Sequence, residues 1–304
     1  MFIVNSEKPY TYEAMQADLK LLAGEYGFLH FFSLGTSVAG RSLSAVRWGD
    51  GSKRIFLNGA HHAMEWITSM LLMRMLEEFS HQYAEDTAIG TIHFRSLFRE
   101  ISLVFCPMVN PDGVNLEING LTDDLPPLTR TRLKAYNGDS TDFTKWQANL
   151  NGVDLNHNYD AGFEKGLFMQ HRLGIYGPGP TRFSGASPES EPESKAVADF
   201  TRSFRPHVAV AYHTQGEQIY YDFESKSTER GKKMAAAMAE ISGYTLDTTD
   251  GMASYSGYKD WVINDFYIPA FTIEAGFGEN PLPLSQFDKI YHDNLKMLLY
   301  LVGF

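Results

Sequence analysis

The segment Arg54–Thr68 reads RIFLNGAHHAMEWIT, and the interpretation of the whole chain starts from it. An apolar run, Ile55–Leu57, leads into two histidines, a glutamate and the start of an amphipathic helix. His62 and Glu65 are separated by two residues, which lets an imidazole and a carboxylate reach one cation. Zinc accepts such nitrogen and oxygen ligands. An isolated HxxE is usually a surface histidine near a surface acid, but this one follows a predicted buried strand, where open α/β sheets place ligand sites.

Two further predicted strands also end in side chains that can bind a metal or move a proton. The run HVAVAYH ends at His213, and the run AFTIE ends at Glu274. In a mostly parallel sheet, the carboxyl ends of the strands meet at one edge. We therefore expect these two side chains to lie near the HxxE pair.

Two histidines and a carboxylate form a three-ligand zinc site with an open position for water, which is typical of catalytic zinc. A glutamate that does not bind the metal then serves as general base. Each residue also has a simpler interpretation, since a histidine at a strand end is usually not a ligand and Glu274 could be a buried acid paired with an arginine. The combination of His62, Glu65, His213 and Glu274 favours the catalytic interpretation.

Composition limits the classes of function. The chain has 304 residues, 43% of them hydrophobic, which is enough for a sizeable core. Its net charge of −11, from 37 acidic and 26 basic residues, disfavours nucleic acid or an anionic membrane as the main partner. The only cysteine is Cys106, so no intrachain disulfide is possible. No signal peptide and no membrane-spanning stretch are visible, so we expect a soluble cytoplasmic protein.

Strand and helix patterns alternate along the chain. Expected helices cover Thr11–Tyr26, Met64–Phe79, Ser190–Phe204, Glu229–Ile241, Lys259–Phe266 and Leu284–Val302. Expected strands cover Phe28–Leu34, Leu43–Trp48, Ile55–Asn58, Ile101–Val109, His207–His213, Ile219–Phe223 and Ala270–Glu274. This alternation predicts an α/β fold with a largely parallel sheet and helices on both faces. Asn110–Gly113 is a predicted turn, and Val114–Leu150 is expected to be an irregular surface excursion.

Several motifs together resemble the zinc carboxypeptidase (M14) metallopeptidases. They are GAHHAMEWIT, NPDGV, GVDLNHNY, the SPESEPE stretch, AYHTQ and FTIEAGFGENPLP, in family order and spread over roughly residues 35–304. The resemblance implies a three-layer α/β/α sandwich around a mixed, twisted sheet of about eight strands. It implies one catalytic domain over residues 1–304, with a long surface insertion at about 114–150.

The resemblance also implies roles for individual residues. One zinc ion is bound by His62, Glu65 and His213, with Glu274 as base and proton shuttle. Asp154 matches an acid that hydrogen-bonds a ligand histidine, expected to be His62; such a bond fixes the tautomer and raises the ligand's basicity. His61 competes with His62, but His62 occupies the motif position.

Departures from the family pattern concern substrate binding. Asn156 matches a substrate-binding asparagine, which the family follows with an arginine that grips the terminal carboxylate of the substrate. Here that place is His157. A neutral imidazole lacks the planar fork that suits a carboxylate, so trimming of ordinary C-termini is less expected.

Two other family positions are also changed. The arginine that polarises the scissile carbonyl aligns with Gln147, and Lys145 and Arg132 are possible substitutes. The expected tyrosine aligns with Met252, so Tyr255 or Tyr258 could fill that role.

Within the family, AHHAMEW and DLNHNYDAGF look closest to the γ-D-glutamyl-meso-diaminopimelate peptidases. This implies a murein-peptide substrate, whose extra carboxylates could be bound by cations of the insertion and by Arg182, although solvated surface charge is the more common role of such residues. The alternatives are a metallocarboxypeptidase, a zinc N-acyl amino acid hydrolase, and an inactive peptide-binding module. An HExxH string is absent, which excludes peptidases of that type.

Overall fold

An eight-stranded mixed sheet lies at the centre of the structure, a computed structural model that describes residues 2–247 and 255–304. Its strands, in spatial order, are β1 (His30–Thr36), β2 (Ser42–Trp48), β6 (Ile101–Cys106), β3 (Lys53–Gly59), β7 (Val208–His213), β10 (Ala270–Glu274), β8 (Gln218–Tyr220) and β9 (Thr245–Asp247). The central strands β6, β3, β7 and β10 run parallel to one another. Strands β1 and β2 continue the sheet antiparallel at one side, and β8 pairs antiparallel with β10 at the other. The three-layer fold expected from the sequence is confirmed.

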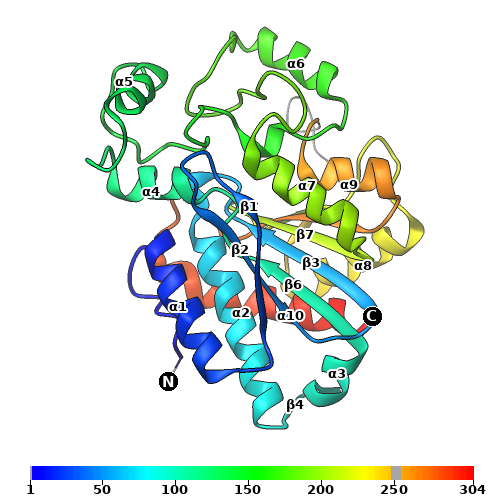
Figure 1. The fold of residues 1–304 in the computed structure, drawn as a ribbon. Helices are drawn as coiled ribbons and strands as arrows, with labels where there is room; N and C mark the ends of the chain where they lie inside the picture. The colour runs from blue at the N-terminus through cyan, green and yellow to red at the C-terminus, as the bar shows by residue number, and fades with distance from the viewer. Residues whose placement is uncertain (1, 248–254) are drawn as a thin grey trace.

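Helices cover both faces of the sheet (Figure 1). One face carries α1 (Tyr12–Glu25), α2 (Ile67–Ala84), α8 (Glu229–Ser242) and α10 (Phe287–Gly303). The other face carries α7 (Pro192–Phe204) and α9 (Tyr258–Phe266). At one end of the sheet lie α3 (Phe94–Glu100) and the short hairpin of β4 (Ala88–Ile89) and β5 (Ile92–His93). None of the helices in the described ranges combines the length and the apolarity that a membrane crossing requires.

The central strands are buried on both faces, which explains their continuous apolar sequences. Side chains alternate between the two layers: Ile55 and Leu57 of β3 join the core under α2 and α10, and Phe56 joins the core under α7 and α9. A residue that ends such a strand is therefore held firmly in place by the packing behind it.

The segment after β6 contains more helix than expected. Asn110–Gly113 is not a free turn: Pro111 begins α4 (Pro111–Asn119), and the Asn110 side chain accepts a hydrogen bond from the Gly113 amide at 3.0 Å. Helix α5 (Pro127–Tyr136) follows, and α6 (Phe163–Arg172) lies further along the chain. Within the expected irregular region, a small apolar cluster is built from Leu116, Leu125, Leu133, Phe143, Trp146, Ala148 and Leu150.

The single cysteine lies at the end of β6. Cys106 is fully buried in the core beneath α7 and α9. Burial raises the pKa of its thiol to about 12, because the thiolate would have to form away from water.

Candidate metal centre

Three strand ends bring the predicted residues to one edge of the sheet. His213 is the last residue of β7, and Glu274 is the last residue of the neighbouring strand β10. After β3 the chain turns through His62 into the single helical turn η1 (Ala63–Glu65), which Glu65 ends. Residues more than 200 positions apart in sequence therefore meet because parallel strands end together.

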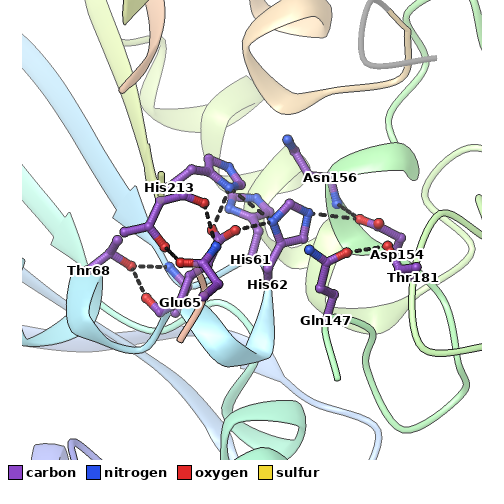
Figure 2. Close-up of polar contacts among 12 residues, drawn as sticks. His61, His62, Glu65, Thr68, Gln147, Asp154, Asn156, Thr181 and His213 are labelled. Atoms are coloured by element: carbon purple, nitrogen blue, oxygen red, sulfur yellow. Dashed lines mark hydrogen bonds and ion pairs between the residues drawn. The ribbon is translucent and has the colours of Figure 1, made fainter. Parts of the chain in front are cut away.

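His62, Glu65 and His213 converge on one point (Figure 2). His62 Nδ1 lies 2.8 Å from Glu65 Oε1, His213 Nδ1 lies 2.9 Å from Glu65 Oε2, and the two Nδ1 atoms are 3.3 Å apart. Ligands about 2.05 Å from a tetrahedral zinc ion are separated by roughly 3.3 Å. The spacing and the two-nitrogen, one-carboxylate donor set therefore fit a zinc ion.

Asp154 holds His62 from the other side. Its Oδ1 lies 3.1 Å from His62 Nε2, which is the hydrogen bond expected from the sequence. Its Oδ2 accepts a hydrogen bond of 2.9 Å from the backbone amide of Arg182. With Nε2 donating to a carboxylate, His62 presents the lone pair of Nδ1 toward Glu65 and His213.

The charges around the histidines favour a cation. Burial alone lowers the pKa of His62, but the nearby carboxylates of Glu65 and Asp154 outweigh it and raise this pKa well above the usual value. Burial acts to raise the pKa of Asp154, and the neighbouring histidines reverse this, so that the pKa lies well below the usual range. Two ionised carboxylates thus surround the imidazole, and positive charge, whether a proton or a metal ion, is stabilised there.

The turn that carries His62 and Glu65 is fixed by groups that sequence analysis did not identify. Thr68 Oγ1 accepts a hydrogen bond from the Ala60 amide and donates one to the Glu65 carbonyl, both at 2.8 Å. The Asn110 amide donates to the carbonyls of His61 and Ala148. The position of Thr68, three residues after Glu65, could have indicated the threonine contacts from sequence. The contacts of Asn110 depend on the tertiary fold and could not.

Glu274 stands beside the three predicted ligands with a free carboxylate. Within the described part of the chain, no hydrogen bond or ion pair engages its side chain, which is half-buried. Burial and the negative charge of Glu65 raise the pKa of Glu274 well above its ordinary value. A carboxylate with weakened acidity and no partner is suited to accept a proton.

His61 is not among the three converging side chains, although its ring stacks on that of His213 at a centroid distance of 5.6 Å. Its ring is fully buried, with Nε2 2.9 Å from the hydroxyl of Tyr159, and burial lowers its pKa well below the usual value. A buried neutral imidazole bonded to a tyrosine is a packing element. The structure therefore places His62, and not His61, with Glu65 and His213.

The predicted substrate-binding residues Asn156 and His157 lie in η2 (Leu155–His157), next to Asp154. Asn156 Oδ1 accepts a hydrogen bond of 3.1 Å from the Tyr258 amide, and no described residue forms a hydrogen bond with its NH₂ group (Figure 2). His157 Nδ1 lies 3.2 Å from the carbonyl oxygen of Tyr255. An acceptor carbonyl makes Nδ1 the donor, so in the neutral ring Nε2 accepts.

Neither tyrosine considered from the sequence contacts the three predicted ligands. Tyr258 is fully buried, and its hydroxyl is 3.0 Å from Thr201 Oγ1 of α7. The Tyr255 ring packs edge-on against Phe223 and lies near Lys165 of α6. Met252, the aligned position, lies outside the described residues.

The three candidates for carbonyl polarisation have different surroundings. Lys145 Nζ donates a hydrogen bond of 2.6 Å to the carbonyl of Asn280, and Arg132 is exposed on α5. The side-chain oxygen of Gln147 is bonded to the hydroxyl of Thr181, which leaves its NH₂ group turned toward His62 (Figure 2). Among the described residues, no hydrogen bond engages the NH₂ group of Gln147, and the Gln147 carbonyl accepts a hydrogen bond of 2.9 Å from the amide of Ala63, the residue after His62.

Comparison with known proteins agrees with this geometry. Residues 15–297 match the sequence profile of the zinc carboxypeptidases, peptidase family M14. Gamma-D-glutamyl-L-diamino acid endopeptidase 1 of Lysinibacillus sphaericus is 38% identical over 300 residues, which cover 98% of this chain and 73% of that protein. The uncharacterized protein YqgT of Bacillus subtilis (strain 168) is 31% identical over 291 residues, covering 95% and 76%.

Solved structures show the same fold. The crystal structure of thrombin activatable fibrinolysis inhibitor superposes with a TM-score of 0.74 at 19% identity, covering 100% of this chain and 79% of that one. Murein-tripeptide amidase MpaA from Escherichia coli O157 superposes with a TM-score of 0.54 at 19% identity, covering 90% and 92%.

Proposed function

The chain belongs to the zinc carboxypeptidase family and is a zinc metallopeptidase, and we propose that it hydrolyses the γ-D-glutamyl-diaminopimelate bond of murein peptides. The observation that carries this proposal is the 38% identity, over 98% of the chain, to an endopeptidase named for γ-D-glutamyl-L-diamino acid bonds. His157 supports it, because a carboxypeptidase needs a strong grip on a terminal carboxylate and an imidazole provides a weaker one than a guanidinium.

His62, Glu65 and His213 would hold one zinc ion, and Asp154 would hold the His62 ring in the required tautomer. When bound, zinc supplies Lewis acidity, which polarises the scissile carbonyl and makes the attacking water more acidic. The packed strands behind His213 and the Thr68 hydrogen bonds keep these side chains in position, so little reorganisation is needed during the reaction.

Glu274 accepts the proton of the attacking water and then donates it to the leaving nitrogen. No described residue forms a hydrogen bond or ion pair with its side chain, so the carboxylate is available to hold the proton between the two steps. The free amide of Gln147 donates a hydrogen bond to the carbonyl oxygen as negative charge develops there. Its own oxygen is bound by Thr181, which prevents the amide from rotating freely.

Mass spectrometry of a defined murein tripeptide, L-Ala-γ-D-Glu-meso-diaminopimelate, tests the substrate. The expected products are L-Ala-D-Glu and free diaminopimelate, formed with zinc and abolished by a chelator. Intact tripeptide in the presence of full zinc occupancy would contradict the proposal.

A matched substrate pair separates this activity from carboxypeptidase action. The second substrate is a tetrapeptide in which the residue after diaminopimelate carries a C-terminal amide. A γ-D-glutamyl endopeptidase cuts both substrates at the same bond. A carboxypeptidase could release the C-terminal diaminopimelate of the tripeptide but would leave the blocked tetrapeptide intact. Release of C-terminal residues from free-ended α-linked peptides alone would assign the chain to the carboxypeptidases instead.

A further inference from the structure

A polar surface cavity lies at the end of the sheet opposite the metal centre. It has a volume of about 400 Å³ and is lined by Ser52, Lys53, Arg54, His207 and Arg230. Lys53 and Arg54 begin β3, and His207 directly precedes β7. The metal centre lies beyond the other ends of these two strands, and seven strand residues span roughly 20 Å. The cavity is therefore separate from the catalytic site.

The cations of this cavity are not neutralised by acids. Lys53 Nζ donates a hydrogen bond of 3.0 Å to the carbonyl of Val302, and Arg54 Nε donates one of 2.9 Å to the carbonyl of Arg205. The Arg230 guanidinium lies over the ring of Phe304. Among the described residues, no carboxylate forms an ion pair with any of the three cations. Other cations of this acidic protein, such as Lys165 and Arg202, are paired with acids, whereas this cavity is lined by three cations that are not.

His207 adds a neutral hydrogen-bond donor. Its Nδ1 accepts a hydrogen bond of 3.0 Å from the Arg54 amide, so in the neutral ring the proton is on Nε2. Burial and the charges of Arg54, Arg230 and Lys53 lower the pKa of His207. Burial and the charge of Arg230 also lower the pKa of Lys53, against the opposing charge of Glu100. The positive groups thus repel one another, and a bound anion would remove that repulsion.

We propose that this cavity binds a small molecule that carries a phosphate group. The donors come from three separate segments: the start of β3, the residue before β7 and the first turn of α8. A tetrahedral phosphate offers acceptor oxygens in several directions, whereas a planar carboxylate is best matched by one guanidinium fork. The volume exceeds that of a single phosphate and leaves room for the organic part of a phosphorylated metabolite.

Isothermal titration calorimetry on the zinc-loaded full chain at constant ionic strength tests this proposal. The probes are inorganic phosphate, fructose 1,6-bisphosphate and the tricarboxylate tricarballylate. We expect saturable 1:1 binding of the bisphosphate, weaker binding of inorganic phosphate and the weakest binding of tricarballylate. Arg54→Gln and Arg230→Gln should each raise the Kd of the bisphosphate by about tenfold, because each removes a charge-assisted contact.

Lys233→Gln is the matched control, since Lys233 is an exposed cation on the same helix as Arg230 but does not line the cavity. The Kd of the bisphosphate for the Lys233→Gln variant should stay within about twofold of the wild-type value. If Lys233→Gln and Arg230→Gln weaken bisphosphate binding equally, the effect comes from net charge alone, and the proposed site is wrong. The absence of saturable binding to the wild type, or tighter binding of tricarballylate than of the bisphosphate, would also overturn the proposal. Circular dichroism verifies that each variant is folded.

Discussion

Glu274 and His213 are register partners on the neighbouring parallel strands β10 and β7. The Ala275 amide donates a hydrogen bond of 2.8 Å to the His213 carbonyl and fixes this register just beyond the strand. Because neighbouring strands lie about 4.8 Å apart, the register places the proposed base directly beside a proposed ligand. A slip of one residue would turn Glu274 to the opposite face of the sheet, so the backbone pairing itself sets the distance on which catalysis depends.

Glu274→Gln should abolish turnover while the metal stays bound. The amide is nearly isosteric but cannot accept the proton of water, and we expect kcat to fall by about 10²–10⁴-fold. Zinc content by elemental analysis and kcat on the murein tripeptide are measured on the same preparation. A near-normal kcat in the fully zinc-loaded variant would show that Glu274 is not the general base.

Replacement of the predicted ligands should release zinc, whereas replacement of the neighbouring His61 should not. His62→Ala and His213→Ala each remove one of the three converging donors and should yield protein with little zinc. His61→Gln is the matched control, because His61 is bonded to Tyr159 instead. Stoichiometric zinc in His62→Ala together with zinc loss in His61→Gln would reverse the assignment.

Asp154→Asn should weaken zinc binding without removing a ligand. The neutral amide no longer favours the Nε2–H tautomer of His62, and the loss of such a contact costs about 10–100-fold in affinity. Competition with a chromophoric chelator measures the zinc Kd. Asp160→Asn, at an exposed acid six residues later, is the control and should bind zinc like the wild type.

Gln147→Ala should lower kcat more than it raises KM. The lost amide is expected to act mainly on the developing oxyanion, and removal of one such donor costs about 10²–10³-fold in kcat. Steady-state kinetics of Gln147→Ala and Arg132→Gln are compared on the same tripeptide. A larger kcat loss in Arg132→Gln would identify the arginine as the group that polarises the carbonyl.

The free energy of unfolding should depend on pH through Glu193. Burial raises the pKa of Glu193 in the folded state to about 7, and the hydrogen bonds from Val38 and Asn149 offset this only in part. The unfolded value is 4.5, so between these two pH values the folded protein holds a proton that the unfolded chain has lost. Stability from this group therefore falls as pH rises through the window, by on the order of 3 kcal/mol in total.

Glu193→Gln lacks this dependence. The difference in unfolding free energy between variant and wild type should therefore shift in favour of the variant between about pH 4.5 and pH 7. Urea unfolding at a series of pH values measures it, with the exposed Glu164→Gln as control. A constant difference across the window would contradict the prediction.

The parts of the fold that could be predicted are those buried on both sides. Strands β6 and β7 read as ISLVFC and VAVAYH, because every residue in them is covered. The sequence predicts a turn where α4 begins, because Asn110 and Pro111 are suited both to a turn and to the start of a helix. The sequence does not predict helix α6, because the helix buries only Phe163, Gly166 and Gln170, which form no apolar stripe.

The same reasoning separates the predictable part of the site from the rest. His62, Glu65, His213 and Glu274 could be brought together from sequence because strand ends in a parallel sheet share an edge. The contacts of Gln147 with Thr181, and of Asp154 with the Arg182 amide, depend on the path of the irregular chain between α5 and α7. The hydrophobic pattern of the sequence does not indicate the course of this irregular segment, so these contacts could be identified only from the structure.

The covered, weakly acidic thiol of Cys106 has a practical consequence for following this enzyme in solution. A maleimide reacts with thiolate that it can reach, and the native chain offers almost none. An added cysteine at an exposed position, such as Leu128→Cys on α5, should therefore take up one fluorophore per molecule without removal of the natural residue. Mass spectrometry should show a single adduct in Leu128→Cys and none in the parent protein. The native Cys106 would then not interfere with fluorescence distance measurements on added cysteines.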